Sequence, residues 1–264
     1  MTSYARFRKL LLQRPLAAVL TLAAAGTLTL APAAASAAPA RPMPPRLVYG
    51  VTFAADSALY RLYPRSHRAV LAGRAGTRLT DLAFRHGILY AISFTALYRL
   101  SPASGARHKI GSLGITAANA LATQPGTDAL YGADQHGEFF RVNPRTGRAA
   151  VIGRYGHGLG SSGDLVFANH RLYATVTRPH SAESILATVN VRTGAARIVG
   201  RTGYHRVWGL VAAGRQLYGA TSAGSFLAIS AWTGRARVIW REGLDIGGLT
   251  TVSPCPWAGQ ATVC

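Results

Sequence analysis

The sequence predicts an all-β fold: a five-bladed β-propeller built from four-stranded blades. Three observations lead to this fold class. A tyrosine motif recurs at a nearly constant spacing, every copy carries the same short strands and turns, and the two ends of the repeated region complement each other.

The tyrosine motif occurs five times, at successive intervals of 41, 41, 42 and 45 residues. A repeat of about 40 residues is the length of a four-stranded propeller blade. The copies are LVYGV at Tyr49, ILYAI at Tyr90, ALYGA at Tyr131, RLYAT at Tyr173 and QLYGA at Tyr218.

Four short strands can be traced in each copy. An apolar strand such as DLAF at 81–84 comes first, and the tyrosine strand follows after a short turn. A third strand ends in a turn rich in Pro, Gly, Ser and Thr, as in FFRVNPRTG, and a fourth strand such as AAVIGR closes the unit. Short strands with turns every 8 to 12 residues indicate an all-β blade.

The ends of the repeated region predict how the ring closes. The first copy begins at its second strand, LVYGVTF, and lacks a first strand. The segment GGLTTV at 247–252 supplies a first strand without a blade of its own, and joining the two leaves no exposed sheet edge. Six blades are the alternative, but the tail after Val252 is too short and too rich in Pro and Cys to form another blade.

The N-terminal residues predict export. Basic residues precede an apolar stretch at 15–31, and an A-x-A cleavage pattern follows at 35–37, so residues 1–37 are predicted to be a secretory signal peptide and the protein to be secreted. A transmembrane anchor is the alternative, but the stretch is short, and no later segment is apolar enough to span a membrane. Residues 38–46 are Pro-rich and predict a linker.

The propeller domain is assigned to residues 47–264, with a tail that contains both cysteines. Cys255 and Cys264 lie within the last ten residues, and in an exported chain this placement predicts one disulfide. Two free thiols are the alternative.

The charge is strongly positive: 29 Lys and Arg against 9 Asp and Glu give +20. A basic extracellular protein attracts polyanions such as wall polymers, acidic polysaccharide, nucleic acid or anionic lipid. Nearly all basic residues are Arg, which a GC-rich genome also explains, and nothing beyond net charge indicates nucleic acid.

The repeat pattern of G-L/D-L, LYG, L-x-x-(I/V)-x-P-x-T-G and (I/V)-G spans nearly all of residues 47–252. It resembles bacterial secreted repeat-propeller families, many of unknown function, and is distantly similar to gluconolactonase-like and streptogramin-lyase-like propellers. The distant families imply a metal site of several carboxylates and an Asn on the axis. This chain has few acidic residues there, so the resemblance implies the fold more than an activity.

The residues that enter the channel in each blade form the first candidate site. Asp81, Asn119 and Asp164 start innermost strands, and their oxygens are ligands that suit Ca²⁺. Side-chain bonds to backbone amides are the alternative role for such residues. If the metal is present, His157 or His205 is a candidate general base of a Ca²⁺-dependent lyase or hydrolase.

A second candidate site is a rim of arginines that follow the fourth strands. Such a rim is either protection of the sheet edges or a collar for an anionic ligand, and nearby aromatic residues suit stacking on sugars. The sequence thus favours a secreted binding protein for an anionic polymer, glycan or protein, with the Ca²⁺-dependent enzyme as the alternative. The expected ligand-binding residues are Arg74, Arg154, Tyr155, His157, Arg201, Tyr204, His205, Trp208 and Arg241.

Overall fold

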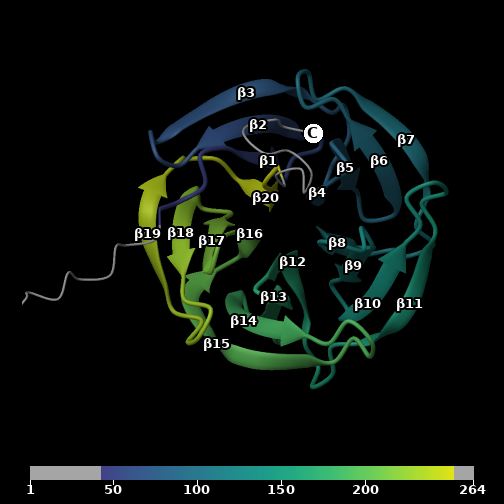
Figure 1. Cartoon of the computed structure of the whole chain (residues 1–264), viewed down its shortest axis with the longest axis vertical. Coiled ribbons are helices and arrows are strands. Elements are labelled where there is room, and N and C mark those ends of the chain that lie inside the picture. Colours follow the sequence, from purple (N-terminus) through teal and green to yellow (C-terminus); the bar gives the residue numbers. More distant parts are fainter. Residues whose placement is uncertain (1–42, 253–264) are drawn as a thin grey trace, which may run out of the picture. The chain divides into compact units, whose positions relative to one another are not determined.

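The computed structural model describes residues 43–252, which form a ring of five four-stranded antiparallel sheets around a central channel (Figure 1). The described residues contain no helix. The predicted five-bladed propeller is therefore confirmed. The signal peptide predicted over 1–37 and the disulfide predicted between Cys255 and Cys264 lie outside the described residues.

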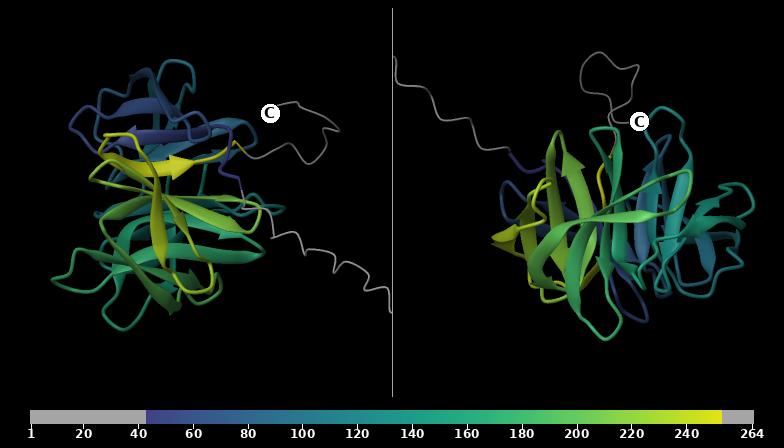
Figure 2. Two further views of the ribbon diagram at one scale, coloured as in Figure 1. Left: turned by 90° about the vertical axis from the view of Figure 1, so that its left-hand side faces the viewer. Right: turned by 90° about the horizontal axis from the view of Figure 1, so that it is seen from below.

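Each blade runs from an innermost strand at the channel to an outermost strand at the edge (Figures 1 and 2). In that order the strands are β20 (Ile246–Thr250), β1 (Val48–Thr52), β2 (Ala58–Tyr63) and β3 (Arg68–Arg74) in blade 1; β4 (Asp81–Arg85), β5 (Ile88–Ile92), β6 (Ala96–Leu100) and β7 (Arg107–Ser112) in blade 2; β8 (Ala118–Thr123), β9 (Leu130–Asp134), β10 (Glu138–Val142) and β11 (Ala149–Arg154) in blade 3; β12 (Gly160–Ala168), β13 (Arg171–Thr177), β14 (Glu183–Val189) and β15 (Ala196–His205) in blade 4; and β16 (Val207–Ala213), β17 (Gln216–Thr221), β18 (Ser225–Ile229) and β19 (Ala236–Arg241) in blade 5.

The ring closes as the sequence predicts. The last strand, β20, pairs antiparallel with β1, and Gly50 lies opposite Leu249 (Figure 1). The strand occupies Ile246–Thr250, so it begins one residue before the predicted segment 247–252 and ends two residues before its end. Blade 1 is thus made from both ends of the described chain, and β1 has no open inner edge.

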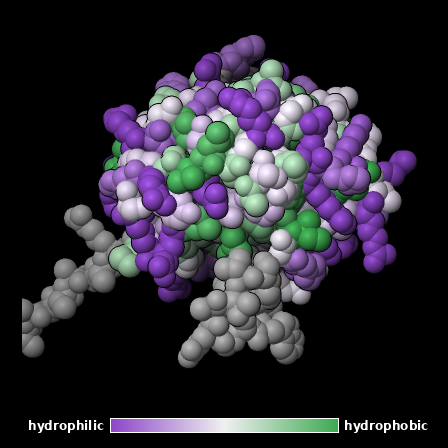
Figure 3. Space-filling model, turned by 90° about the horizontal axis from the view of Figure 1, so that it is seen from above, coloured by the Kyte–Doolittle hydropathy of each residue, from purple (hydrophilic) through white to green (hydrophobic). Residues whose placement is uncertain are grey.

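The apolar core lies between neighbouring blades. The inner strands are buried along nearly their whole length because a blade packs on each of their two faces, as in β9, where every residue is buried. The outermost strands instead mix exposed and half-buried residues, and hydrophilic side chains cover much of the outer surface with apolar ones between them (Figure 3). Blade-to-blade packing therefore holds the ring together.

Four of the five contacts between blades use glycine in the same way. In each seam, a glycine of the outermost strand meets the turn between the third and fourth strands of the next blade. A Cβ added at Gly111, for instance, would lie 2.1 Å from the carbonyl oxygen of Thr146, so no larger residue fits without moving backbone. The four glycines are Gly73, Gly111, Gly153 and Gly200.

Part of the Pro-rich linker packs on the propeller. The carbonyl of Pro44 accepts a hydrogen bond from Arg65 Nε at 2.7 Å, and Pro45 is buried. Residues 43–46 therefore lie against blade 1, while residues 38–42 are outside the described part of the chain.

Candidate functional site

The ring has two faces, which are named here by their loops. The mouth face carries the loops that lead into the innermost strands, such as residues 75–80, and the loops between second and third strands, such as 93–95. The turn face carries the short turns between first and second strands, such as 86–87, and between third and fourth strands, such as 101–106.

At the centre of the mouth face lies a pocket of about 60 Å³, called here the mouth pocket. All five blades contribute to it, each with a residue at or near the start of its innermost strand. The residues that line it are Phe53, Thr80, Phe94, Asn119, Gln135, Ser162, Gly163, Trp208 and Gly247.

One side of the mouth pocket is aromatic. The ring of Phe53 meets the ring of Trp208 edge-on at 5.2 Å between centroids and the ring of Phe94 at 6.0 Å. The guanidinium of Arg78 lies over the Phe53 ring at 5.2 Å, within the range of a cation–π contact. This places a positive charge beside the aromatic rings of the pocket.

Sequence reasoning identified Trp208 and missed the two phenylalanines. A signal for them exists: Phe53, Phe94 and Gln135 all stand four residues after the repeated tyrosine, at Tyr49, Tyr90 and Tyr131. That position follows the second strand of each blade and faces the same mouth. Aligning the copies at this position finds all three.

The polar side of the pocket contains one acceptor without a partner. Asn119 is 6% exposed, and its Nδ2 donates to the carbonyl of Ser161 at 3.1 Å. Its Oδ1 is buried and accepts no hydrogen bond within the described chain. Thr80, by contrast, is satisfied, because its hydroxyl is within bonding distance of the carbonyls of Ile92 and Ala118.

Below the pocket, two fully buried carboxyl groups join all five innermost strands. Asp81 accepts the amide of Leu82 at 2.7 Å and that of Leu121 at 2.6 Å. Asp164 accepts three amides, one from its own strand and two from β16 and β20. These are Leu165 at 2.6 Å, Leu210 at 2.6 Å and Leu249 at 3.1 Å.

The two carboxyl groups also hydrogen-bond to each other. Burial raises the pKa of Asp81 well above its usual range, and the charge of Asp164 raises it further. Burial raises the pKa of Asp164 as well. Both shifts favour the protonated form, because two like charges in one dry site repel each other.

This arrangement tests the predicted Ca²⁺ site. All four carboxylate oxygens of Asp81 and Asp164 already accept backbone amides, which is the alternative role considered for these residues. A cation would have to displace those amides from the axis. Asn119 Oδ1 alone is left as an oxygen ligand, and six to eight are usual for Ca²⁺. The residues therefore do not fit the ion as they are arranged.

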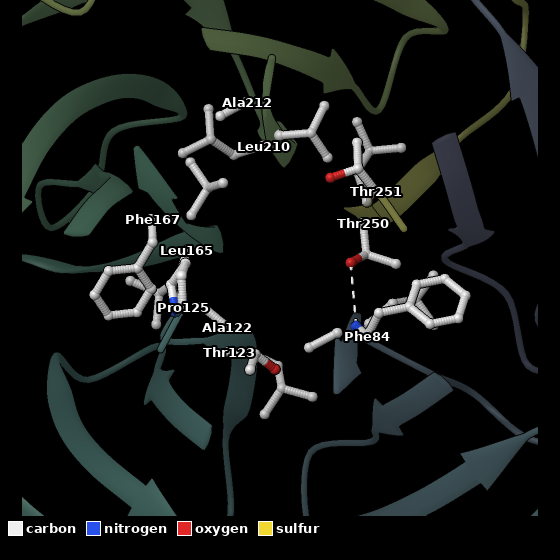
Figure 4. Close-up of a pocket in the computed structure, with 16 residues that line it drawn as sticks. Phe84, Ala122, Thr123, Pro125, Leu165, Phe167, Leu210, Ala212, Thr250 and Thr251 are labelled. Atoms are coloured by element: carbon white, nitrogen blue, oxygen red, sulfur yellow. Dashed lines mark hydrogen bonds between the residues drawn. The ribbon is translucent and has the colours of Figure 1, made fainter. Parts of the chain in front are cut away.

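Beneath the carboxyl pair, the channel widens to a cavity of about 90 Å³ that opens toward the turn face (Figure 4). Most of its lining side chains are apolar, among them Leu165 and Leu210. Its polar side chains are threonines, and the Thr250 hydroxyl accepts the amide of Phe84 at 3.3 Å. The mouth pocket, with its aromatic rings and the unpartnered acceptor of Asn119, is therefore the stronger candidate for specific binding.

The predicted arginine rim lies at the outer edge of the mouth face, where Arg74, Arg154 and Arg241 end their outermost strands and Arg201 lies within the longer β15. Three of its four members are paired with a carboxylate of their own blade. Arg74 lies 3.7 Å from Asp56, Arg154 lies 3.0 Å from Glu138, and Arg201 lies 2.9 Å from Glu183.

The fourth rim arginine, Arg241, bonds to the hydroxyl of Ser225 at 3.3 Å. The rim therefore carries little uncompensated charge, and it lies away from the channel-lining residues of the mouth pocket. A collar for an anionic ligand is less well supported by this geometry than by the sequence.

The other expected ligand-binding residues are placed differently. Tyr155 is only 1% exposed and belongs to the core between blades 3 and 4, so its ring cannot stack on a ligand; this corrects the sequence-based expectation. Tyr204 is half-buried against the core of blades 4 and 5. His157 and His205 are exposed and do not line the mouth pocket.

Comparison with known proteins supports the fold. No protein-family model matches this chain, and no curated protein does. The chain is similar to one in the crystal structure of a nidogen/laminin complex, with 12% identity, a TM-score of 0.53, and 77% of this chain and 97% of that chain covered. A structural-genomics protein of unknown function from Bacteroides thetaiotaomicron shows 14% identity, a TM-score of 0.49, and coverage of 72% and 55%.

At 12% identity, the similarity to the chain in the nidogen/laminin complex shows the fold alone, and that fold is a β-propeller. Within residues 43–252 the structure has no helix long and apolar enough to cross a membrane.

Proposed function

We propose that this propeller is a binding module whose mouth pocket holds the terminal residue of an acidic glycan. The observation that carries the proposal is a buried acceptor without a partner, Asn119 Oδ1, beside an aromatic wall in one pocket. A buried acceptor left unpaired costs free energy, so a ligand group that donates to it is favoured.

The aromatic wall supports a sugar as the ligand. Sugar rings present apolar C–H faces together with hydroxyl groups, and flat aromatic side chains pack on such faces. Phe53, Phe94 and Trp208 supply the rings, while Gln135 and Ser162 supply further polar groups around the same pocket. Apolar walls with a few placed polar groups are typical of small-ligand sites.

Arg78 supports an acidic sugar over a neutral one. Its side chain is exposed, and its guanidinium is held over Phe53 at the pocket. An Arg fork pairs well with a carboxylate, which a uronic acid carries. The small volume of the pocket favours a chain end over the middle of a chain.

An enzyme function and a protein ligand are the two alternatives to this proposal. A Ca²⁺-dependent lyase or hydrolase is not favoured, because the carboxylate oxygens of Asp81 and Asp164 already accept backbone amides. The nidogen/laminin complex is an assembly of proteins, which makes a protein ligand at the mouth face the main competitor.

The test is calorimetric titration with digalacturonic acid and, in parallel, with the neutral disaccharide cellobiose. At near-physiological salt, the wild type should bind the acidic sugar more tightly. Trp208→Ala should weaken this binding about tenfold or more, as loss of a central aromatic contact does. The matched control is Trp232→Ala, because Trp232 is 83% exposed and lies on the turn face.

Arg78→Gln tests the preference for an acidic sugar separately from the binding of a sugar ring. It should reduce binding of digalacturonic acid and leave binding of cellobiose unchanged. Equal affinities of the Trp208→Ala and Trp232→Ala variants, or no binding of either sugar, would overturn the proposal and leave a protein ligand as the occupant to pursue.

A further inference from the structure

The charges of this protein are divided unequally between its two faces. All nine acidic residues of the chain lie within the described residues. Two are on the channel axis, and six are in the mouth-face half. Only Asp128 is in the turn-face half, and it is already paired with His86 at 3.0 Å.

Arginine is distributed the opposite way. Seven arginines are in the mouth-face half, against its six acidic residues. Fifteen are in the turn-face half, at the ends of first and third strands, at the starts of second and fourth strands, and in the turns between them. They are Arg46, Arg61, Arg65, Arg68, Arg85, Arg99, Arg141, Arg145, Arg148, Arg171, Arg192, Arg197, Arg215, Arg235 and Arg237. Arg107 also starts an outermost strand, but its guanidinium donates to the carbonyl of Ala75 in a mouth-face loop.

Composition and edge protection do not account for this separation. A general bias toward Arg would add arginine to both faces and would not remove acidic residues from one of them. Protection of sheet edges explains arginines at the starts of outermost strands, such as Arg68 and Arg148. It does not explain Arg85, Arg171 or Arg215, which lie at or beside the turns of inner strands.

Two hollows on the turn face are lined by several of these arginines. The first, about 480 Å³, lies beside blade 3 and is lined by Arg85, Arg141, Arg145 and Arg148, together with Asp128, the carboxylate that pairs with His86. Arg85 is held in place because its Nε donates to the carbonyl of Asp128 at 2.7 Å. The other three arginines are exposed and have no carboxylate within ion-pair distance in the described chain.

The second hollow, about 990 Å³, lies beside blade 4 and extends to blade 5. It contains Arg171, Arg192 and Arg197, and the exposed ring of Trp232 belongs to its wall. Uncompensated arginines thus occur in separate hollows and on all five blades of the ring.

We propose that the turn face is a second binding site, for an extended polyanion that carries phosphate or sulfate groups. Arg forks bind such groups in a bidentate way, and clustered arginines that outnumber their acidic neighbours produce a strong positive potential. A single small anion would use one hollow only, whereas a linear polymer reaches several. Recessed hollows between turns also suit a flexible chain better than a flat bilayer.

The experiment compares two triple variants that change the net charge equally. The turn-face variant is Arg141→Gln/Arg145→Gln/Arg148→Gln, and the control from the mouth face is Arg74→Gln/Arg154→Gln/Arg201→Gln. Affinity for fluorescent linear polyphosphate, and separately for heparin, is measured by anisotropy over a range of salt concentrations.

The turn-face variant should bind polyphosphate about tenfold more weakly or worse at low salt, with a shallower salt dependence, because fewer counterions are released. The mouth-face control should change affinity less than about threefold, since its arginines are compensated. Trp208→Ala should bind polyphosphate like the wild type, which keeps this test independent of the mouth pocket.

Equal losses in both triple variants would show that net charge alone attracts the polymer and would overturn the proposal. Binding to vesicles that contain phosphatidylglycerol, without binding to either soluble polymer, would also overturn it, in favour of a membrane surface. Circular dichroism and a melting curve for each variant establish that the propeller is intact.

Discussion

The imidazole of His67 in blade 1 stacks on the indole of Trp240 in blade 5, at 6.0 Å between ring centroids and 8° between ring planes. This stack replaces the glycine contact of the other four seams. Trp240 stands where the other outermost strands have glycine, and His67 stands in the turn of the following blade. The seam that closes the ring is therefore built differently from the rest.

The stack should contribute measurably to closure. Trp240→Ala removes the contacts with His67 and with Phe226, whose ring centroid lies 6.2 Å away, and should lower the free energy of unfolding by about 2 kcal/mol. A double-mutant cycle with His67→Ala, measured by urea unfolding, should give a coupling of about 1 kcal/mol. Strict additivity would show that the two rings do not interact.

A second prediction concerns the same seam and pH. Glu242 stands two residues after Trp240, where the other blades, two residues after the seam glycine, bury Ala75, Leu113, Tyr155 and Thr202. Burial raises its pKa to about 7, and its two carboxylate oxygens accept no hydrogen bond from another described residue.

Because the folded state holds this proton more tightly than the unfolded state, stability should fall as pH rises from about 4.5 through about 7. Glu242→Gln should remove a decrease on the order of 2 kcal/mol between pH 5 and pH 8. Thermal unfolding across that range measures the effect, and Glu138→Gln is the control at an exposed ion pair. A Glu242→Gln variant with the wild-type pH dependence would refute the assignment.

The buried carboxyl pair should be a main determinant of stability. Asp164→Ala leaves three buried amides without an acceptor, and Asp81→Ala leaves two. At about 1 to 3 kcal/mol per orphaned group, both variants should be strongly destabilised, with Asp164→Ala the worse of the two. Urea unfolding against the half-buried Asp128→Ala control measures this, and equal midpoints for all three variants would contradict it.

Addition of Ca²⁺ or of a chelator should leave the melting temperature unchanged, because the axial oxygens are occupied by amides. Differential scanning calorimetry with and without the ion provides the measurement. A saturable increase in melting temperature that Asn119→Ala abolishes would restore the Ca²⁺ site predicted from sequence.

Closure by the last strand can be tested by truncation. Removal of residues 246–264 deletes β20, exposes the inner edge of β1 and takes the Leu249 amide from Asp164, so the whole domain should lose stability. Removal of residues 253–264 alone is the control and leaves β20 in place. A protein truncated before Ile246 that melts at the wild-type temperature would rule out this role for β20.

The fold was predictable because repetition multiplies a weak signal. A single LYG segment indicates little, but five copies at one spacing, with complementary ends, determine the blade number and the closure. The position of Asp81 and Asp164 at the channel followed from the same alignment. Their partners did not, because Leu210 and Leu249 come from other blades and are brought near only by the closed ring.

The candidate site was predictable only in part. Trp208 and Asn119 were found at strand starts, whereas Tyr155 was misplaced because it follows an exposed arginine, Arg154, in the sequence. Alternation along the chain turns the next side chain inward, into the space between two blades. The pairing of Arg154 with Glu138 also depends on strand register, which spacing within one strand does not reveal.

The separation of charge between the two faces makes the molecule an electric dipole with its positive end on the turn face. Near any negatively charged surface, such a dipole rotates before it makes contact, so approach is not random in direction. The turn face arrives first and the mouth points back toward the solution. If the turn face binds polyanions as proposed, the propeller takes up one orientation on such a surface and its mouth pocket stays accessible.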